Sequence, residues 1–548
     1  MITDHLRELV HSALGRAFDV LGEAASPEIR FERPKRREHG DWSTNVALSL
    51  GKGNPRVLAQ EIVDHMPASD LVAGIDVAGP GFINFRLAPK WLHDVVRRAA
   101  DPSGRFGRSD EGGGEKINVE YVSANPTGPV NVVSGRHAAY GDAVSSLLAA
   151  VGYEVVREFY VNDAGRQAAL FGASASARYM QALGHEAQVP EDGYQGDYLE
   201  TLARELVEEH GDEFVEMSTE ERSLSLGRLG LERMLTDMER DLGAFGTKFD
   251  MWFRESQLHE SGALEWALSD LKQRGYIEER DGATWFLATE FGDDKDRVVI
   301  RSTGEPTYLA ADIPYLINKF ERGFKHLIYV WGSDHHGTVA RLLAVAQALG
   351  LERERVEVRL VQIVTLSSGG TSLKASKRQG VLVPLSDLVA EVGADAARYM
   401  FLTRSIDAPL DFDIELAKEQ APENPVYYVQ YAHARISSII RKAEEEGVRW
   451  DARSSDLAIL EHPAEDELMR KLASYEEAIP QAAETRAPQR LTRYVEELAS
   501  VFSSFYRDCK VVSDDVKLTR ARLSLCLATR SVIADGLGIL GVSAPERM

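Results

Sequence analysis

One stretch of this chain follows the order strand, loop, helix, strand, and it constrains the fold more than any other feature. Residues 117–123 (INVEYVS) form an apolar segment with β-branched side chains, which predicts a buried strand. A loop with Pro and Gly at 125–129 leads to residues 135–152, whose helical periodicity ends in a glycine, and residues 154–161 predict a second strand. This order begins a parallel α/β sheet, because parallel neighbours need a helical crossover between them.

The same order returns in the second half of the chain. Residues 326–332 predict a strand, residues 337–350 a helix and residues 358–366 another strand. An acidic, helix-rich segment at about 168–255 lies between the two α/β stretches. We therefore expect one Rossmann-type nucleotide-binding domain whose halves are separated by a helical insertion.

The chain has 548 residues, too many for a single hydrophobic core, so we expect about three domains. Residues 1–110 mix helix, strand and turn patterns and predict an α+β domain, which a Gly- and Asp-rich linker at 101–116 closes. Residues 111–415 hold the α/β domain with its insertion. Residues 416–548 have helical patterns with few Gly or Pro, and they predict an all-α bundle.

The charge balance limits the partners that the chain can have. It has 63 Lys and Arg against 86 Asp and Glu, a formal net charge of −23. This sign excludes a protein that coats nucleic acid through its overall potential, and we expect no DNA partner. An RNA partner stays possible where basic residues cluster, because a bound strand feels the local potential.

Apolar runs and cysteines point to a soluble protein. No apolar run reaches the roughly eighteen residues that span a bilayer, and the N-terminal helix pattern carries charges throughout, unlike a signal peptide. We expect a cytoplasmic protein with no membrane partner. Cys509 and Cys526 are expected to be reduced, packed thiols, and they cannot build a four-ligand zinc site without scattered histidines. We therefore expect no bound structural metal.

Two segments suggest a nucleotide site without a common Gly-rich phosphate loop. The chain has no GxxxxGK[ST], and no GxGxxG follows a strand and opens a helix. Residues 120–142 (EYVSANPTGPVNVVSGRHAAYGD) turn from a strand into a helix at the carboxyl end of the first strand, where open α/β sheets bind ligands. Residues 373–380 (LKASKRQG) form a basic loop after the last strand of the second half, and such a loop on its own is usually a solvated turn.

In this order the two segments resemble HIGH and KMSKS, the ATP-binding motifs of class I aminoacyl-tRNA synthetases. The likeness covers nearly the whole chain. Residues 38–48 and 78–87 are similar to the extra N-terminal domain of bacterial-type arginyl-tRNA synthetases, and residues 423–443 to that family's anticodon-binding domain. The catalytic core of the family resembles FYVNDAGRQ, GDDKDRVVIRSTGEPTYLAADI and VWGSDHHG of this chain. The chain is identified by resemblance as a member of this family.

The resemblance implies a two-step reaction. Arginine attacks the α-phosphate of ATP, which enters with Mg²⁺, to give arginyl-adenylate, and the arginyl group then moves to the terminal ribose of tRNA(Arg). Catalysis is then mainly positioning and charge stabilisation, with Lys374 and Lys377 expected to stabilise the leaving pyrophosphate. The expected ATP-binding residues are Asn131, Val133, Ser134, Lys374, Ser376 and Lys377.

The planar guanidinium of arginine carries five donors and calls for carboxylates. By resemblance, Glu120 and Asn125 bind arginine from the first strand and its loop. Tyr308 and Asp312 face the same pocket from the start of a helix, and Asp334 or one of the two histidines after it completes the pocket. Such a pocket rejects lysine or ornithine because it would leave buried groups unpaired, so no editing domain is needed.

Two segments are expected to contact tRNA. The densest basic run lies at 30–37, where Arg36 and Arg37 are the predicted contacts, and a solvated charge run is an equally good interpretation. The helix at 423–443 has aromatic residues beside polar side chains, which suits stacking on unpaired anticodon bases. Tyr431 and Arg435 are its predicted contacts, although part of this helix must also be core.

The HIGH-type motif is altered here to Asn-Val-Val-Ser at 131–134. Asn131 and Ser134 keep uncharged hydrogen-bonding side chains, and Val133 places an isopropyl group where the family has a glycine beside adenine. Two explanations stay open: an active ligase with an adjusted pocket, in which His137 helps, or a catalytically impaired protein that binds tRNA or arginine. The carboxylates and the basic loop favour the first.

Two other classes fit less well. A cysteinyl-type synthetase shares the helical C-terminal domain, but its zinc site cannot be assembled from this sequence. A non-enzymatic RNA-binding module is disfavoured by the charge of −23 and by the carboxylates of the expected pocket. We expect a monomer, as is usual in the family.

Overall fold

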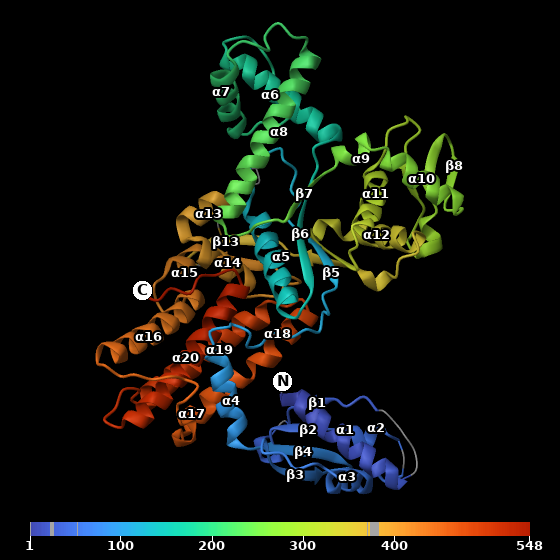
Figure 1. Ribbon diagram of the computed structural model, residues 1–548. Coiled ribbons are helices and arrows are strands. Elements are labelled where there is room, and N and C mark those ends of the chain that lie inside the picture. The colour runs from blue at the N-terminus through green and yellow to red at the C-terminus, as the bar shows by residue number, and fades with distance from the viewer. Residues whose placement is uncertain (1, 22–26, 35, 52, 370, 373–382) are drawn as a thin grey trace.

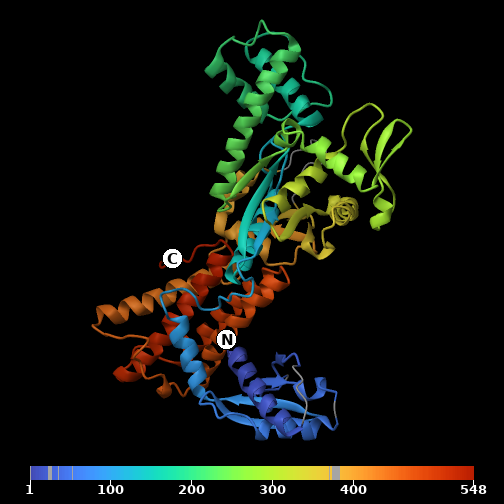
Figure 2. The same ribbon diagram turned by 45° about the vertical axis from the view of Figure 1, so that its right-hand side comes forward.

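The computed structural model describes the chain except for residues 1, 22–26, 35, 52, 370 and 373–382. Figure 1 shows an N-terminal domain in blue at one end, a helical bundle in orange and red beside it, and a central sheet with a helical insertion in green at the other end. Figure 2 shows the same order after rotation, with the insertion and the N-terminal domain at opposite ends of the molecule.

The central sheet has five parallel strands in the order β12-β11-β5-β6-β7. This arrangement confirms the predicted α/β fold with a Rossmann-type domain. Two strands, at 154–161 and 326–332, begin and end at the residues predicted from the sequence. The strands are β5 (Lys116–Glu120), β6 (Glu154–Val161), β7 (Met251–Arg254), β11 (His326–Gly332) and β12 (Val356–Val361).

Two predicted strands differ from the structure. The strand expected at 117–123 ends at Glu120, because Val122 and Ser123 have φ values of 68° and 41°, in the left-handed region that continues no strand. The strand expected at 358–366 is two strands, and only the first, β12, stays in the central sheet. The second, β13 (Val364–Ser368), pairs with β14 (Thr371–Ser372) and β15 (Leu410–Asp413) in a small separate sheet.

Two insertions interrupt the central domain. The first is helical, and it ends before β7, which is part of the central sheet although the sequence interpretation carried the insertion to about 255. The second insertion, which the sequence did not suggest, adds a three-stranded sheet in the order β10-β9-β8. The first contains α6 (Gly165–Ala182), α7 (Tyr198–His210) and α8 (Thr219–Ala244); the second contains α9 (Ser256–Glu260), α10 (Ala263–Gln273), β8 (Ile277–Arg280), β9 (Ala283–Phe286) and β10 (Arg297–Ile300).

Three helices connect the strands of the central sheet. Helix α5 (Val132–Ala150) follows β5, and almost all of its residues are buried, since it packs on β5, β6, β11 and α14. Helix α11 (Tyr308–Glu321) precedes β11. Helix α12 (His336–Ala348) leads from β11 to β12. This sequence of crossovers is what parallel strands require.

The N-terminal region is built on an antiparallel sheet in the order β1-β2-β4-β3. A further helix, α4 (Pro89–Ala99), leaves this sheet and packs on α17 and α20 of the C-terminal bundle, as Figure 1 also shows. The other elements are α1 (Ile2–Leu21), β1 (Phe31–Glu32), β2 (Trp42–Thr44), α2 (Val46–Ser49), α3 (Pro55–Asp64), β3 (Val72–Ala78) and β4 (Phe82–Leu87).

The C-terminal region is helical, as predicted. Both cysteines are buried in it as free thiols, and burial raises the pKa of Cys526 to about 12. No helix in the described part of the chain is long and apolar enough to cross a membrane. Helices α13 (Leu385–Val392) and α14 (Ala394–Leu402) come before this region, and its own helices are α15 (Ile414–Lys418), α16 (Pro425–Glu445), α17 (Pro463–Ala473), α18 (Tyr475–Glu484), α19 (Gln489–Asp508) and α20 (Val516–Ile539).

Candidate active site

The order of the central strands marks one edge of the sheet as the ligand site. Strands β5 and β11 are neighbours, but the chain runs outward from them in opposite directions, first through β6 and then through β12. Such a switch point opens a crevice at the carboxyl ends of the two strands. The turn after β5 and the short 3₁₀ helix Ser333–His335 after β11 form the two sides of this crevice.

The altered HIGH-type tetrad, residues 131–134, lies at the start of helix α5. The side-chain Oδ1 of Asn131 accepts a hydrogen bond from the backbone N–H of Ser134 at 3.0 Å, so Asn131 is the N-cap of the helix. The capping bond uses only the amide oxygen, so the amide nitrogen Nδ2 can donate to a ligand. Val133 and Ser134 are half-buried in the first turn, at the positive end of the helix dipole, which favours anions.

The segment that follows the basic loop is anchored to this helix start. The N–H of Val132 donates to Val383 O at 3.0 Å, and the N–H of Leu385 donates to Val130 O at 2.8 Å. Asn131 and Pro384 form an isolated antiparallel bridge. The three predicted residues of the loop, Lys374, Ser376 and Lys377, lie outside the described residues, but the chain leaves their segment directly beside the tetrad.

Glu120, the last residue of β5, is buried with a fully buried lysine. Lys319 of α11 donates to Glu120 Oε2 at 2.6 Å, and the hydroxyl oxygen of Tyr315, which bridges to Glu158, lies 2.8 Å from the same oxygen. Among the described residues, the other oxygen, Oε1, accepts only a 3.3 Å bond from the hydroxyl of Ser123. One oxygen of Glu120 is thus used by the protein, and the other is available to a ligand.

A second buried carboxylate lies opposite Glu120 on the next strand. Glu158 accepts bonds from Tyr315 at 2.5 Å, from Arg322 at 2.6 and 3.0 Å and from Asn118 at 2.9 Å. Burial alone would raise the pKa of Glu158, but Lys319, Arg322 and Tyr315 outweigh it and hold that pKa below its usual value. Glu158 is therefore a satisfied anion that fixes Lys319 and Tyr315 in place.

Asp312 is the carboxylate whose neighbouring cations, Arg341 and Lys319, do not outweigh its burial. It lies on α11, half-buried, and burial together with the negative charges of Glu120 and Glu255 raises its pKa to about 7. Glu255, directly after β7, is also buried. Burial raises the pKa of Tyr160, and the negative charges of Glu255 and Asp312 raise it further, so both carboxylates act on this hydroxyl. Three acidic groups from β5, β7 and α11 thus meet at one place, which favours a cation as ligand.

The other predicted arginine-binding residues lie at the rim. Asn125 is exposed on the loop after β5, and the side chain of Tyr308 is 66% exposed at the start of α11. The Asp334 side chain is 84% exposed after β11, with His335 at 3.8 Å. The structure thus brings Glu120 and Asp312 together and leaves Asn125, Tyr308 and Asp334 facing solvent. The sequence interpretation missed Glu255, Glu158 and Lys319, although a charged residue at the end of an apolar strand is a usable signal.

An aromatic and cationic surface lies on the C-terminal bundle. Tyr427 stacks on Tyr431 with ring centroids 6.0 Å apart, and the Arg435 guanidinium lies 4.6 Å from the Tyr431 ring and 5.4 Å from the ring of Tyr506 on α19. Tyr431 and Tyr506 are each 40% exposed. Tyr506 was not expected from the sequence, because only the packing of α16 on α19 brings it to this surface.

The N-terminal basic run is largely paired with carboxylates. Arg36 lies 3.3 Å from Glu38, and Arg33 donates to Glu477 of α18. Arg37 starts a 3₁₀ helix, and its side chain lies outside the described residues. Part of this run therefore joins the N-terminal domain to the bundle, while Arg36 stays exposed.

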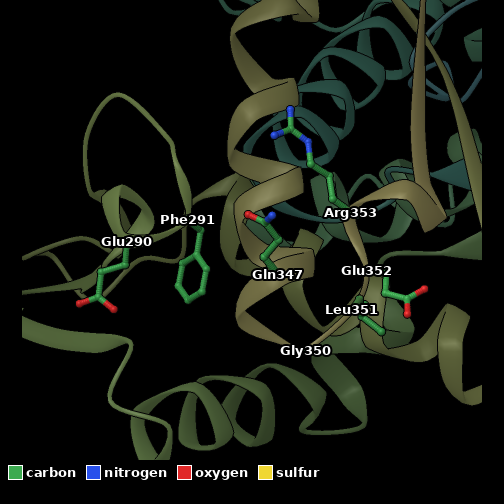
Figure 3. Close-up of a pocket in the computed structure, with 7 residues that line it drawn as sticks. All are labelled: Glu290, Phe291, Gln347, Gly350, Leu351, Glu352 and Arg353. Carbon is green, nitrogen blue, oxygen red and sulfur yellow. The ribbon is translucent and has the colours of Figure 1, made fainter.

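An open hollow of about 630 Å³ lies at the other edge of the central domain (Figure 3). Its walls are Phe291 and Glu290 from the second insertion and the chain around Gln347–Arg353. Helix α12 starts at the carboxyl end of β11 and ends at this hollow, so the hollow and the crevice are at opposite ends of the helix. None of the predicted site residues lines it.

The five-stranded switch-point sheet, with insertions between its halves and the segment 383–385 bonded to the start of α5, defines the catalytic domain of a class I aminoacyl-tRNA synthetase. The family models agree along the chain. Residues 104–405 match the model "tRNA synthetases class I (R), catalytic domain", residues 4–87 match "Arginyl tRNA synthetase N terminal domain", and residues 429–548 match "DALR anticodon binding domain". The chain belongs to the arginyl-tRNA synthetase family.

Individual relatives are similar over their full length. The arginine–tRNA ligase of Moorella thermoacetica is 47% identical over 542 residues, 98% of this chain and 97% of the relative. That of Geobacillus thermodenitrificans is 45% identical over 550 residues, 100% and 99% of the two chains. The structure of Thermus thermophilus arginyl-tRNA synthetase, 24% identical, has the same fold, with a TM-score of 0.76 over 100% of both chains.

Proposed function

We propose that this protein is an arginine–tRNA ligase, which activates L-arginine with ATP and transfers the arginyl group to tRNA(Arg). The observation that supports arginine as the substrate is the cluster of three carboxylates, Asp312, Glu255 and Glu120, at the carboxyl edge of the sheet. Lys319 pairs with Glu120, but one buried cation does not balance three acidic groups, and a guanidinium offers both further positive charge and several donors.

In this proposal Asp312 and Glu255 bind the guanidinium of arginine. Glu120 uses its Oε1, which otherwise accepts only the long bond from Ser123 among the described residues, while Lys319 and Tyr315 hold Oε2 and fix the direction of the carboxylate. The exposed residues Asn125, Tyr308 and Asp334 bind arginine from the rim of the pocket. A substrate without the full set of guanidinium donors leaves buried carboxylate oxygens unpaired, which is the basis of discrimination against lysine.

ATP enters as its magnesium complex and lies along the start of α5. The half-buried amide of Asn131, the hydroxyl of Ser134 and the positive end of the helix dipole face its phosphates, and Val133 borders its adenine. Lys374, Ser376 and Lys377 come from the loop that leads into the Val383–Leu385 anchor. These lysines neutralise the charge that builds on pyrophosphate as the arginine carboxylate attacks the α-phosphate.

The tRNA is bound outside the catalytic domain (111–415) by the regions 1–110 and 416–548. Tyr431 and Arg435 stack on anticodon bases, since their exposed faces form one surface with Tyr506. Arg36 and Arg37 contact the tRNA backbone. A catalytically impaired protein that binds only tRNA or arginine is the alternative, and no observation on the described residues favours it.

The test is formation of arginyl-tRNA by the purified protein from labelled arginine, ATP, Mg²⁺ and tRNA. The proposal expects turnover that requires all four components and that is lost with Asp312→Asn. Absence of product at micromolar enzyme would contradict ligase activity. Binding of arginine and tRNA by the same inactive sample would then support the impaired alternative.

A further inference from the structure

His137, in the second turn of α5, is a buried histidine with an unsatisfied ring nitrogen. The residue is only 8% exposed, and its Nε2 atom has no hydrogen-bond partner among the described residues. A buried polar atom without a partner is uncommon in proteins and calls for an explanation, and a bound ligand is one such explanation. A ligand that reaches Nε2 would satisfy it.

The imidazole lies against the turn that ends β11. A Cβ atom built on Gly332 would be 3.9 Å from Cε1 of His137, so the ring faces the backbone of this glycine. Ser134 is one helical turn earlier on the same side of α5, which places the two side chains along one face. The charges of Asp334 and His335 act on the same ring. His137 therefore lies in the crevice between the α5 start and the β11 turn.

The surroundings of His137 indicate what kind of group it meets. Burial lowers the pKa of His137 to about 4, and the neighbouring Arg136 adds to this effect. The imidazole is therefore neutral at neutral pH, with one nitrogen as donor and the other as acceptor. A neutral ring suits an uncharged hydroxyl better than a phosphate, which would favour the protonated form.

We propose that His137 binds a ribose hydroxyl of ATP through Nε2 and so positions the nucleoside between α5 and the β11 turn. This role rests on the proposed function, because it needs ATP in this crevice. It differs from the roles of the tetrad and the basic loop, which face the phosphates. His137 would thereby anchor the sugar next to Val133.

The test pairs a side-chain change with the loss of each ribose hydroxyl. Arginylation is measured for the full-length protein and for His137→Leu with ATP, 2′-deoxy-ATP and 3′-deoxy-ATP. We expect His137→Leu to raise the KM for ATP about tenfold, equivalent to about 1.4 kcal/mol, with a smaller change in kcat. One of the two deoxynucleotides should raise the KM of the wild type by a similar factor and raise that of the variant no further.

Two further variants separate binding from folding. His137→Gln keeps an amide nitrogen near the Nε2 position and should recover part of the ATP affinity. His93→Leu, the same change on helix α4 of the N-terminal region, should leave the KM of all three nucleotides unchanged. Thermal unfolding and calorimetric binding of arginine show whether each variant is folded.

Two results would overturn the role of His137. One is an unchanged KM for ATP in folded His137→Leu. The other is that His137→Leu raises the KM by the same factor for ATP and for both deoxynucleotides. Failure of the proposed function would look different, because the wild type itself would form no arginyl-tRNA. In that case calorimetric binding of the same three nucleotides to the wild type and to His137→Leu gives the same comparison directly.

Discussion

The guanidinium of Arg398 and the carboxylate of Asp142 form a buried ion pair, with Nη2 2.5 Å from Oδ2 and side chains only 1% and 12% exposed. The pair joins α14 to the middle of α5, whose first turn borders the proposed ATP site. Arg398 also donates to the hydroxyl of Thr247 at 2.8 Å and to the carbonyl of Phe245 at 3.1 Å. One buried side chain thus ties together α5, α14 and the end of the helical insertion.

Replacing Arg398 with Met should strongly destabilise the fold. The change removes one of the two guanidinium partners of Asp142, whose Oδ1 still accepts from Arg157 at 3.0 Å, and it leaves the acceptors of Phe245 and Thr247 without their donor. Loss of one partner of a buried ion pair typically costs about 3–5 kcal/mol, and because Arg157 keeps Asp142 paired we expect the lower end of this range. Urea unfolding followed by circular dichroism measures this loss, and Arg301→Met, in an exposed pair with Glu305, should stay within about 0.5 kcal/mol of wild type. Equal effects of the two changes would contradict the prediction.

The sequence predicted the strands best where only local pattern decides them. The strands at 154–161 and 326–332 are apolar runs bounded by polar residues, and their ends are correct. The strand that carries Glu120 was predicted too long, because Val122 and Ser123 take left-handed backbone angles that no side-chain pattern announces. Such strained non-glycine residues persist only where tertiary contacts hold them.

The sequence could not predict contacts between residues that are distant along the chain. Glu120 and Asp312 were chosen through resemblance, but Glu255 becomes their neighbour only because β7 returns to the central sheet after the insertion. Tyr506 likewise joins Tyr431 only through helix packing. The loop with Lys374 and Lys377 lies outside the described residues, so its roles stay predictions.

Arginine binding should strengthen as the pH rises through 7. The pKa of Asp312 is about 7 in the unliganded protein, and only its ionised form attracts the guanidinium. The Kd for arginine, measured by calorimetry, should therefore fall between pH 6 and pH 8 and then level off. Asp312→Asn should bind arginine weakly and with little dependence on pH in this range. A wild-type Kd that is constant from pH 6 to 8 would contradict this assignment.

The same pKa predicts a trade-off between binding and stability. A carboxyl whose pKa is higher in the folded than in the unfolded state destabilises the fold, increasingly from its ordinary pKa up to about 7 and fully above that. Asp312→Asn removes this cost, so the variant should be more thermostable than wild type at pH 8. The difference should shrink as the pH is lowered toward 5, as thermal unfolding at the two pH values measures. A destabilised variant at pH 8 would show that Asp312 is needed for folding.

Glu255→Gln should weaken arginine binding and also move its pH dependence. Loss of a charged hydrogen-bond acceptor typically costs about 1.5–3 kcal/mol, which corresponds to a KM for arginine roughly 10–100-fold higher. Removing the negative charge of Glu255 also lowers the pKa of Asp312, so the pH midpoint of arginine binding should move downward. Glu260→Gln, exposed at the end of α9, is the matched control and should change neither quantity. If the pH midpoint of arginine binding stays the same in Glu255→Gln, the charge of Glu255 does not act on Asp312.

Tyr506→Ala should weaken tRNA binding without affecting the chemistry of activation. Base stacking on an aromatic ring contributes about 1–3 kcal/mol, so the Kd for tRNA should rise roughly 5–100-fold. Arg435 is packed on the Tyr506 ring and on Tyr431, and Arg435→Gln removes a cation as well as a stacking surface. In filter binding at several salt concentrations, the Arg435 change should therefore reduce the salt dependence, whereas Tyr506→Ala should leave it unchanged. Trp266→Ala, at an exposed tryptophan of α10, should retain wild-type affinity. If it weakens tRNA binding as much as Tyr506→Ala, the loss is not specific to the bundle surface.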